Sequence, residues 1–359
     1  MKDIPVEFFR DNVKRYRQLM KGERPDWAPF RCWLDNYLCC DIAGADPEDY
    51  ARDFDVQLNV QKMVNDRFYD VLDINPGVDM AGLWFDDELF TAENSDAQAN
   101  SFLARDLKDF DRYHNKKSFD DTPCVKRLHE GIKYFNERLP DHKKAGHYLG
   151  VCACLDMFSI FRGADRMFTD LYDDPEQVHR IFSWMTERSL NWMEYCRKHW
   201  GGLNDQSILY DKIDVGEDYC AYLPPDMFDE FVKPYTGKLF DEQKGRAWRS
   251  LHTDGDFHLE NLTKLNELGI DELMGFTPHL DIKDVRKALP DIVLAGNIHP
   301  IKVMNEGSPD DVKAAIRYCF ENAAQDGKFV LCTGGGIGYG AKPENVDAFL
   351  EAVYEICKY

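Results

Sequence analysis

The chain has 359 residues, and its 44 Lys and Arg against 65 Asp and Glu give a formal charge of −21. Such acidity repels phosphate backbones and anionic lipid headgroups, so the composition disfavours binding to nucleic acid or to a membrane surface. With 44% hydrophobic and 13% aromatic residues, the chain can bury a large core and is not expected to be disordered.

The N-terminal segment lacks the apolar stretch of a signal peptide, because Asp, Glu, Lys and Arg recur from the second residue onward. No part of the sequence approaches the roughly 18 uninterrupted apolar residues that a membrane-spanning helix needs. We therefore expect a cytoplasmic protein with no membrane partner.

In chain order, the first elements are less regular than the last. The N-terminal part contains several helical patterns and one strand predicted around Gly82–Trp84. The middle predicts strands at Gly150–Leu155 and Ile208–Val215, with a long helix from Asp173 to Met193 between them. A further helix is expected from about Pro225, where the proline suits a first helical position.

The C-terminal third shows the clearest pattern, since short apolar strands alternate with amphipathic helices four times. The expected strands are Ala247–His252, Ile270–Phe276, Ile292–Ala295 and Phe329–Cys332. The expected helices are 259–268, 281–289, 309–324 and one that starts at Pro343. This alternation is typical of right-handed βα units on a parallel sheet.

The length and the spacing of these units favour an α/β fold of the (β/α)8 TIM-barrel kind over an open sheet. No Gly-x-Gly-x-x-Gly follows an early strand, which weakens a dinucleotide-binding fold. No linker rich in Ser, Gly or Pro divides the chain. We therefore expect one barrel domain over 1–359, with residues 1–75 as a helical extension packed on it.

Polar side chains gather where the expected strands end, and in a barrel these ends surround the site of chemistry. They are Glu217, Asp218, His252, Asp254, His279, Asn297, His299 and Cys332. Carboxylate, imidazole and thiolate together suit Zn²⁺. Each residue also has a structural alternative: Glu217 as a helix cap, His252 as a core histidine, and Cys332 as strand packing.

A glycine-rich loop, Thr333–Gly340, precedes the last helix. It lacks the Lys-Ser/Thr of a phosphate-binding P-loop. Either a close approach of backbone to ligand or a tight turn would explain its glycines.

Several ordered blocks of this sequence resemble the uroporphyrinogen decarboxylase superfamily. They are Gly150–Trp192 with Arg162-Gly163 and Asp170–Glu176, Pro224–Phe228 with Phe231–Tyr235, His252–Asp256, Gly296–Pro300, Gly307–Pro309, and Gly334–Ile337 with Pro343–Asn345. The resemblance covers roughly residues 145 to 359 and implies a (β/α)8 barrel, in agreement with the alternation of elements.

The decarboxylases of that superfamily carry an Arg-Gln-Ala-Gly-Arg-Tyr signature near the N-terminus, which this chain lacks. The nearest region, Gly82–Asp87, is apolar and acidic, the wrong charge for a substrate with eight carboxylates. Gly334–Gly336 stands where the decarboxylases tend to have Gly-His-Gly. The resemblance is therefore closer to the other branch, the corrinoid-dependent methyltransferases, and in particular to their O-demethylase type.

That resemblance implies Zn²⁺ held by Glu217, His252 and Cys332, with Asp254 as a reserve ligand. The coenzyme-M type of methyltransferase has two cysteines at the positions where this chain has Asp254 and Gly335. Asp254 or His299 would donate a proton to the leaving group, and Asn297 and Gly335 would contact substrate. The expected partners are a small-molecule methyl donor, with an aryl methyl ether favoured, and a separate corrinoid protein that carries cobalamin. A homodimer is a further candidate assembly.

Two other functions stay open at this stage. One is a metal-independent decarboxylase or lyase on the same barrel, and the other is a non-catalytic binder of corrinoid or tetrapyrrole. No Asp-x-His-x-x-Gly cobalamin motif occurs, so cobalamin is expected on the partner and not on this chain. Methylamine, methanol and thiol donors would use similar residues.

Overall fold

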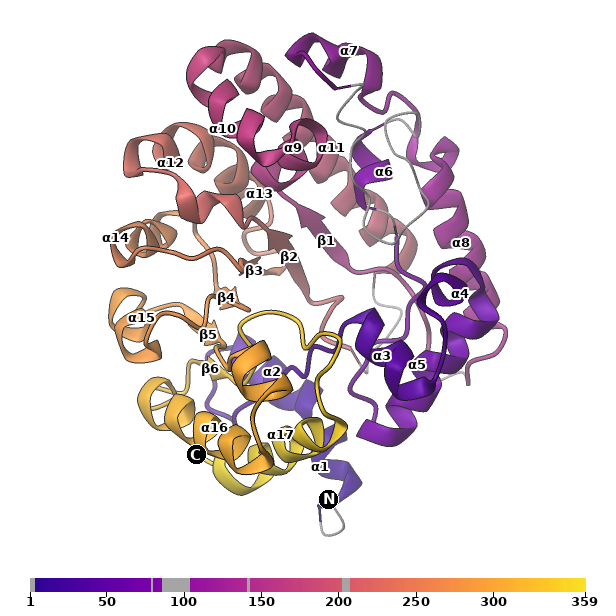
Figure 1. The fold of residues 1–359 in the computed structure, drawn as a ribbon, viewed down its shortest axis with the longest axis vertical. Helices are drawn as coiled ribbons and strands as arrows, with labels where there is room; N and C mark the ends of the chain where they lie inside the picture. The colour runs from indigo at the N-terminus through magenta and orange to yellow at the C-terminus, as the bar shows by residue number, and fades with distance from the viewer. Residues whose placement is uncertain (1–3, 79, 86–103, 141–142, 202–206) are drawn as a thin grey trace.

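The computed structural model describes residues 4–78, 80–85, 104–140, 143–201 and 207–359. These residues form a six-stranded parallel sheet whose spatial order follows the chain, with helices around it (Figure 1). The strands are β1 (Leu149–Cys152), β2 (Lys212–Gly216), β3 (Trp248–His252), β4 (Glu272–Met274), β5 (Val293–Ala295) and β6 (Phe329–Val330). Parallel neighbours in sequential order require a crossover between every pair, which the intervening helical segments supply.

The helices fall into an N-terminal group and a group that alternates with the strands. The first comprises α1 (Val6–Arg10), α2 (Asn12–Met20), α3 (Asn36–Ala43), α4 (Pro47–Arg52), α5 (Phe54–Phe68), α6 (Met80–Trp84), α7 (Phe110–Tyr113) and α8 (Pro123–Asn136). The second comprises α9 (Cys154–Arg162), α10 (Ala164–Asp173), α11 (Pro175–Trp200), α12 (Pro225–Phe231), α13 (Lys238–Asp241), α14 (Leu259–Leu262), α15 (Ile282–Ala288), α16 (Pro309–Ala323) and α17 (Pro343–Ile356). In the described part of the chain, no helix is long and apolar enough to cross a membrane.

The N-terminal region also contributes backbone to the sheet. Phe30 pairs in parallel with Leu331, and Leu34 with Ile337, so the segment 30–34 lies beyond β6. Arg31 of this segment forms an ion pair with Asp214 of β2, with Nη1 3.2 Å from Oδ2. In a flat sheet with strands about 4.8 Å apart, these residues would be separated by more than 20 Å. The sheet must therefore curve back on itself, and the predicted α/β barrel is confirmed.

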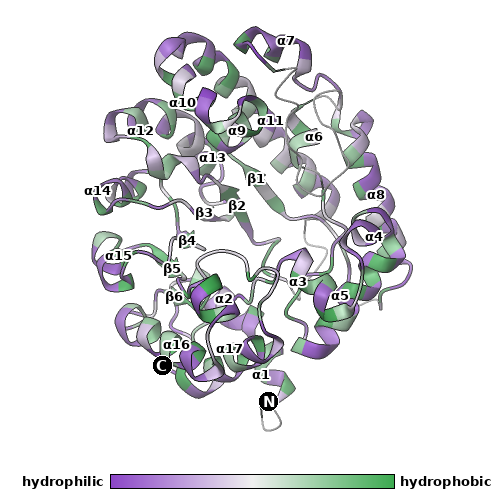
Figure 2. Ribbon diagram, viewed as in Figure 1, coloured by the Kyte–Doolittle hydropathy of each residue, from purple (hydrophilic) through white to green (hydrophobic). Residues whose placement is uncertain are grey.

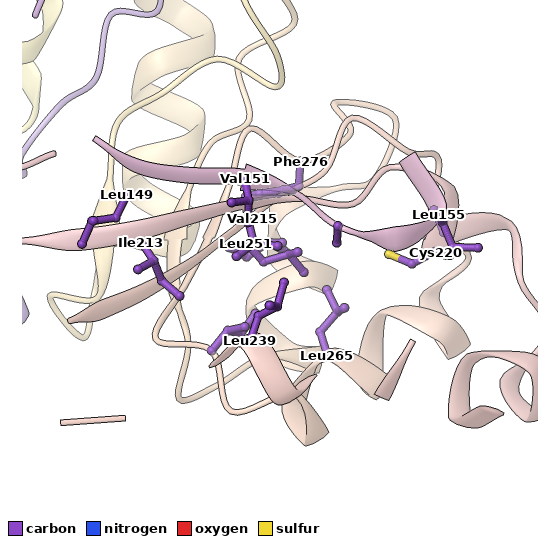
Figure 3. Packing of buried hydrophobic residues seen from close by; sticks show 14 of the residues in the cluster. Leu149, Val151, Leu155, Ile213, Val215, Cys220, Leu239, Leu251, Leu265 and Phe276 are labelled. Carbon is purple, nitrogen blue, oxygen red and sulfur yellow. The ribbon is translucent and has the colours of Figure 1, made fainter. Parts of the chain in front are cut away.

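Alternation along the strands divides the core into two layers. Side chains that face the helices come from positions such as Val151, Ile213 and Leu251, and they meet Leu239 and Leu265 of the flanking helical segments (Figure 3). A separate cluster consists of Met274, Val293, Ala295, Val330 and Cys332 packed against Tyr16 and Leu19 of α2. The strand residues of this cluster occupy the alternate positions, whose side chains point into the barrel. Strand β1 carries hydrophobic colour, while hydrophilic colour is widespread on the surrounding helices (Figure 2).

Several predicted boundaries need correction. Gly82–Trp84, expected as a strand, lies in helix α6, where Trp84 is fully buried and its indole N–H donates to the carbonyl of Met185. Packing on α11 therefore overrides a local sequence preference that is weak over three residues. Residues 86 and 87 of the Gly82–Asp87 region lie outside the described residues. The expected strand at Gly150–Leu155 ends at Cys152, because Cys154 already begins α9.

A cluster of charged side chains fills the end of the barrel interior nearest α2. The Lys212 ammonium lies 3.0 Å from Oε1 of Glu272 and 3.1 Å from Oδ1 of Asp214. Tyr16 donates its hydroxyl to Oε2 of Glu272 at 2.5 Å, and Ser250 donates to Oε1 at 2.9 Å. With Arg31 on Asp214, two cations balance two carboxylates, which is how buried charges are tolerated.

A buried histidine before β1 makes the fold sensitive to acid. His147 is 2% exposed, and its ring nitrogens have no hydrogen-bond partner among the residues that the structure describes. Its ring lies 5.6 Å from that of Trp192 and 6.0 Å from that of Trp200. Burial lowers the pKa of His147 to about 3. The unfolded chain then binds the extra proton below pH 6.5, so stability falls as the pH decreases from about 6.5 towards 3.

We expect His147 to contribute about 2 kcal/mol of the stability lost between pH 7.5 and pH 5.0, at about 1.4 kcal/mol per pH unit. Urea unfolding of the wild type and of His147→Phe at both pH values should show a smaller loss in the variant. His199→Phe is the matched control, since exposed His199 also contacts Trp200 (5.9 Å between ring centroids). Equal losses in the wild type and His147→Phe would contradict the prediction.

Candidate active site

His252, the last residue of β3, has one ring nitrogen committed and the other available. Its Nδ1 lies 3.2 Å from the carbonyl oxygen of Met274, and because a carbonyl only accepts, Nδ1 carries the proton. In the neutral ring Nε2 then holds a lone pair, and it lies 3.5 Å from Oδ1 of Asp254. The ring of Trp33 packs edge-on against the imidazole at 4.8 Å. A fixed ring with a free Nε2 suits a metal ligand or a base.

Asp254 is the second predicted residue that the structure brings to this point. Its backbone N–H donates to Oδ1 of Asp218 at 2.6 Å, which fixes the loop after β3 to the loop after β2. Burial raises the pKa of Asp254 to about 6, with His252 opposing the shift and Asp218 adding to it. The side chain is half exposed, so solvent screens part of these interactions. Asp254 can thus exchange protons near neutral pH.

Glu217, directly after β2, is buried and only half satisfied. Its Oε2 accepts a hydrogen bond from Thr236 at 2.9 Å, whereas Oε1 has no partner among the described residues. Burial, followed by the nearby carboxylate of Asp156, raises the pKa of Glu217 well above its usual value. A buried carboxyl oxygen without a partner is costly, and a proton or a cation would relieve that cost.

Cys332 lies apart from these groups. The thiol is fully buried with Met274 and Ala295 inside the barrel, as expected for strand packing. Burial raises its pKa to about 11, and the charges that act on it are those of Arg31, Glu272 and Lys212. Within the residues that the structure describes, no three His, Cys, Asp or Glu side chains are grouped so that they could hold one metal ion. The predicted trio is therefore not gathered at one point.

Two of the predicted substrate-contacting groups have defined local roles. The Asn297 amide donates to the carbonyls of Thr277 and Leu280, both at 3.0 Å, and so fixes the loop after β4. Gly335 has φ +114°, and a Cβ built there would lie 3.1 Å from Oδ1 of Asp254. Glycine thus allows the loop after β6 to approach Asp254 closely.

His299 has its Nδ1 turned to the backbone of its own loop, where it accepts from the N–H groups of Ile301 and Lys302 at 3.3 and 3.4 Å. Burial, followed by Lys302, lowers the pKa of His299. The neutral ring therefore carries its proton on Nε2 and can donate it.

An open cavity of about 550 Å³, here called the mouth cavity, connects these loops. Its lining includes Asp254, His279, His299, Ile301, Gly335 and Tyr339. This volume suits a small organic molecule.

Asp156 is a site residue that the sequence reasoning missed. Its Oδ1 accepts from the backbone N–H groups of Asp218 and Tyr219 at 2.8 and 3.3 Å. Burial, then Asp218, raises its pKa to about 8. Its position just past β1 was the available signal, because the strand-end argument applied to β2 through β6 applies equally to β1.

Comparisons with known proteins place this barrel among related enzymes. A relative named uroporphyrinogen decarboxylase from Prochlorococcus marinus (strain NATL1A) is 25% identical over 185 residues, which is 50% of this chain. The chain thus spans about half the length (48%) of that relative. A relative named methylcobamide:CoM methyltransferase MtbA from Methanosarcina mazei is 21% identical over 266 residues, 69% of this chain and 68% of that protein.

A solved structure described as a methyltransferase from Methanosarcina mazei superposes with a TM-score of 0.70 at 16% identity, covering 96% of this chain and 98% of the other. This likeness shows the fold alone. The family model described as uroporphyrinogen decarboxylase (URO-D) matches residues 91–356, about three quarters of the chain. The chain therefore belongs to the uroporphyrinogen decarboxylase (URO-D) family.

Proposed function

We propose that this protein transfers a methyl group from a methylated small molecule, an aryl methyl ether, to the Co(I) of a separate corrinoid protein. The observation that carries the proposal is the His252–Asp254 pair, with a free imidazole Nε2 facing a carboxylate beside a cavity of about 550 Å³. The relative named methylcobamide:CoM methyltransferase MtbA from Methanosarcina mazei supports it.

Zn²⁺ is the proposed cofactor. The donor chemistry of His252 Nε2 and the Asp254 carboxylate fits this ion. Oε1 of Glu217, which has no partner among the described residues, is a further candidate oxygen. Cys332, placed inside the barrel, is the least suited of the predicted ligands. When bound, zinc would supply Lewis-acid polarisation of the heteroatom that carries the methyl group.

The chain's own residues would bind the donor and handle one proton. The methyl–oxygen bond breaks, the methyl group passes to cobalt of the partner, and the leaving oxygen takes up a proton. Where His252 and Glu217 hold the zinc, Asp254 is left for this donation, because its pKa of about 6 leaves part of the population protonated near neutrality. His299 is the alternative donor through Nε2–H, and Gly335 keeps the loop close enough for substrate to contact both.

The side chains at the rim of the barrel mouth support the proposal that a protein partner binds there. Exposed large hydrophobic side chains lie in the segments that come directly after residues 30–34 and after β2, β3, β5 and β6. They are Tyr37, Tyr222, Leu259, Ile301 and Tyr339. Apolar side chains at the rim of a site are typical of a docking surface. A corrinoid must approach the methyl group closely, so a partner on this rim would be correctly placed.

Decarboxylation is the alternative function, favoured by the family model and by relatives named uroporphyrinogen decarboxylase. It would require cationic side chains to pair with a polycarboxylate substrate. No Lys or Arg is among the described residues that line the mouth cavity.

The test is a methyl-transfer assay with purified protein, Co(I) cobalamin kept reduced, and 2-methoxyphenol. We expect the Co(I) absorption to be replaced by that of methylcobalamin while 1,2-dihydroxybenzene accumulates in equal amount. Carbon dioxide release from uroporphyrinogen, without transfer from any ether, amine or alcohol, would support the decarboxylase instead.

A further inference from the structure

The lining of the mouth cavity has negative charge without cationic partners for an anion. Asp254 lines it, and no Lys or Arg is among its described lining residues. A neighbouring cavity of about 400 Å³ shares His279 and His299 with it and is likewise lined without Lys or Arg, while Asp281 adds a carboxylate.

The nearby charges do not reverse this balance. Asp256 holds His279 through Nδ1 at 2.8 Å and also accepts from Thr277 at 2.5 Å. Lys302 and Glu306 act on His299 in opposite directions. Arg31, deeper in the barrel, already forms its ion pair with Asp214. An anionic ligand would therefore lose hydration without gaining a salt bridge.

The rest of the lining suits a flat, uncharged ring. Pro278, Pro300, Ile301 and Tyr339 offer apolar surfaces, as ring-binding sites generally do. The two histidines offer complementary polar atoms. His299 can donate from Nε2 because its Nδ1 accepts from backbone, and His279 can accept at Nε2 when its Nδ1–H points to Asp256.

From this lining we infer that the mouth cavity binds an uncharged methoxyphenol ring and discriminates against the same ring bearing a carboxylate. The inference rests on the proposed function and names the substrate class of its site. A zinc ion held by carboxylates would be largely neutralised by them, so the lack of a cationic side chain would still decide the preference.

The experiment is a calorimetric titration with 2-methoxyphenol and with 4-hydroxy-3-methoxybenzoate, which differ by one carboxylate. Protein as purified and protein stripped of metal by a chelator are titrated in parallel. We expect the neutral ring to bind about fivefold to tenfold more tightly to the metal-stripped protein, a ratio that Coulomb repulsion across about 7 Å accounts for, and to remain the tighter ligand of the protein as purified. Added salt should reduce the ratio.

Ile301→Lys adds a cation at the exposed rim, and it should reduce the ratio below about two or invert it. Ile301→Gln, a polar change without charge, is the matched control and should keep the wild-type ratio. Equal or tighter binding of the carboxylate by the wild type would overturn the inference, and so would an unchanged ratio in Ile301→Lys. No cobalt acceptor is present, so the preference is measured independently of methyl transfer. Transfer from the carboxylated ether in preference to the neutral one would support the proposed function while overturning this inference.

Discussion

Replacement of His252 by alanine should remove zinc from the protein and lower methyl transfer about a thousandfold. The imidazole is the predicted ligand with a fixed ring, since its Nδ1 lies against the Met274 carbonyl and its Nε2 is directed to Asp254. Loss of Lewis-acid assistance worth about 4 kcal/mol corresponds to that factor in rate. The measurement is zinc per chain by elemental analysis together with the rate of methylcobalamin formation.

The control for this change is His258→Ala. His258 lies six residues along the same loop, is exposed, and makes no side-chain cap to α14. Both zinc content and rate should match those of the wild type. Zinc retained at the wild-type level in His252→Ala would remove His252 from the metal site. Zinc absent from the wild type even after reconstitution would remove the proposed Lewis acid.

The C-terminal third could be predicted well from sequence because its signals are local. The expected 309–324 helix is observed as α16, which starts at Pro309 behind a Ser308 capping box. The expected strand at Ala247–His252 is observed as Trp248–His252. In the N-terminal part, a three-residue pattern such as Gly82–Trp84 carries too little periodicity to outweigh packing, and it proved to be helical.

The candidate site was predictable only in part. A position at the end of a strand gives the height of a residue along the barrel axis, but it does not give the direction in which the side chain points. Gly216 pairs with His252 across β2 and β3, so Glu217 lies one position further along and its side chain turns towards Thr236. Cys332 lies two residues beyond the end of β6, and its thiol packs inside the barrel with Met274. The alternation of faces along a strand therefore turns Glu217 away from the barrel interior in which Cys332 packs, although the strand-end argument had brought the two together.

The cluster of charged side chains inside the barrel leads to the largest expected change in stability. Lys212→Met should lower the free energy of unfolding by about 3–5 kcal/mol, because it leaves the carboxylates of Glu272 and Asp214 without their shared ammonium. Burial alone would raise the pKa of Asp214, but Lys212 and Arg31 together lower it to about 2. Urea or guanidinium unfolding at neutral pH measures the loss.

Lys233→Met is the matched control. The Lys233 ammonium also contacts two carboxylates, those of Asp229 and Glu267, but all three side chains are exposed. Its removal should change the free energy of unfolding far less than Lys212→Met does, because water already solvates and screens these charges. The contrast between two lysines with the same number of acidic partners isolates the effect of burial.

A second substitution separates lost charge balance from lost packing. In Lys212→Met/Glu272→Gln, one buried carboxylate disappears together with the ammonium, and the amide oxygen can accept from one of the Tyr16 and Ser250 hydroxyls while the amide NH2 donates to the other. The double variant should therefore recover part of the stability lost in Lys212→Met, because an unpaired buried charge costs more than an absent pair. If instead the double variant is the less stable of the two, packing of the lysine stem and not charge compensation accounts for the effect. The same unfolding curves decide between these causes, since the two variants share the methionine and differ only in the charge at Glu272.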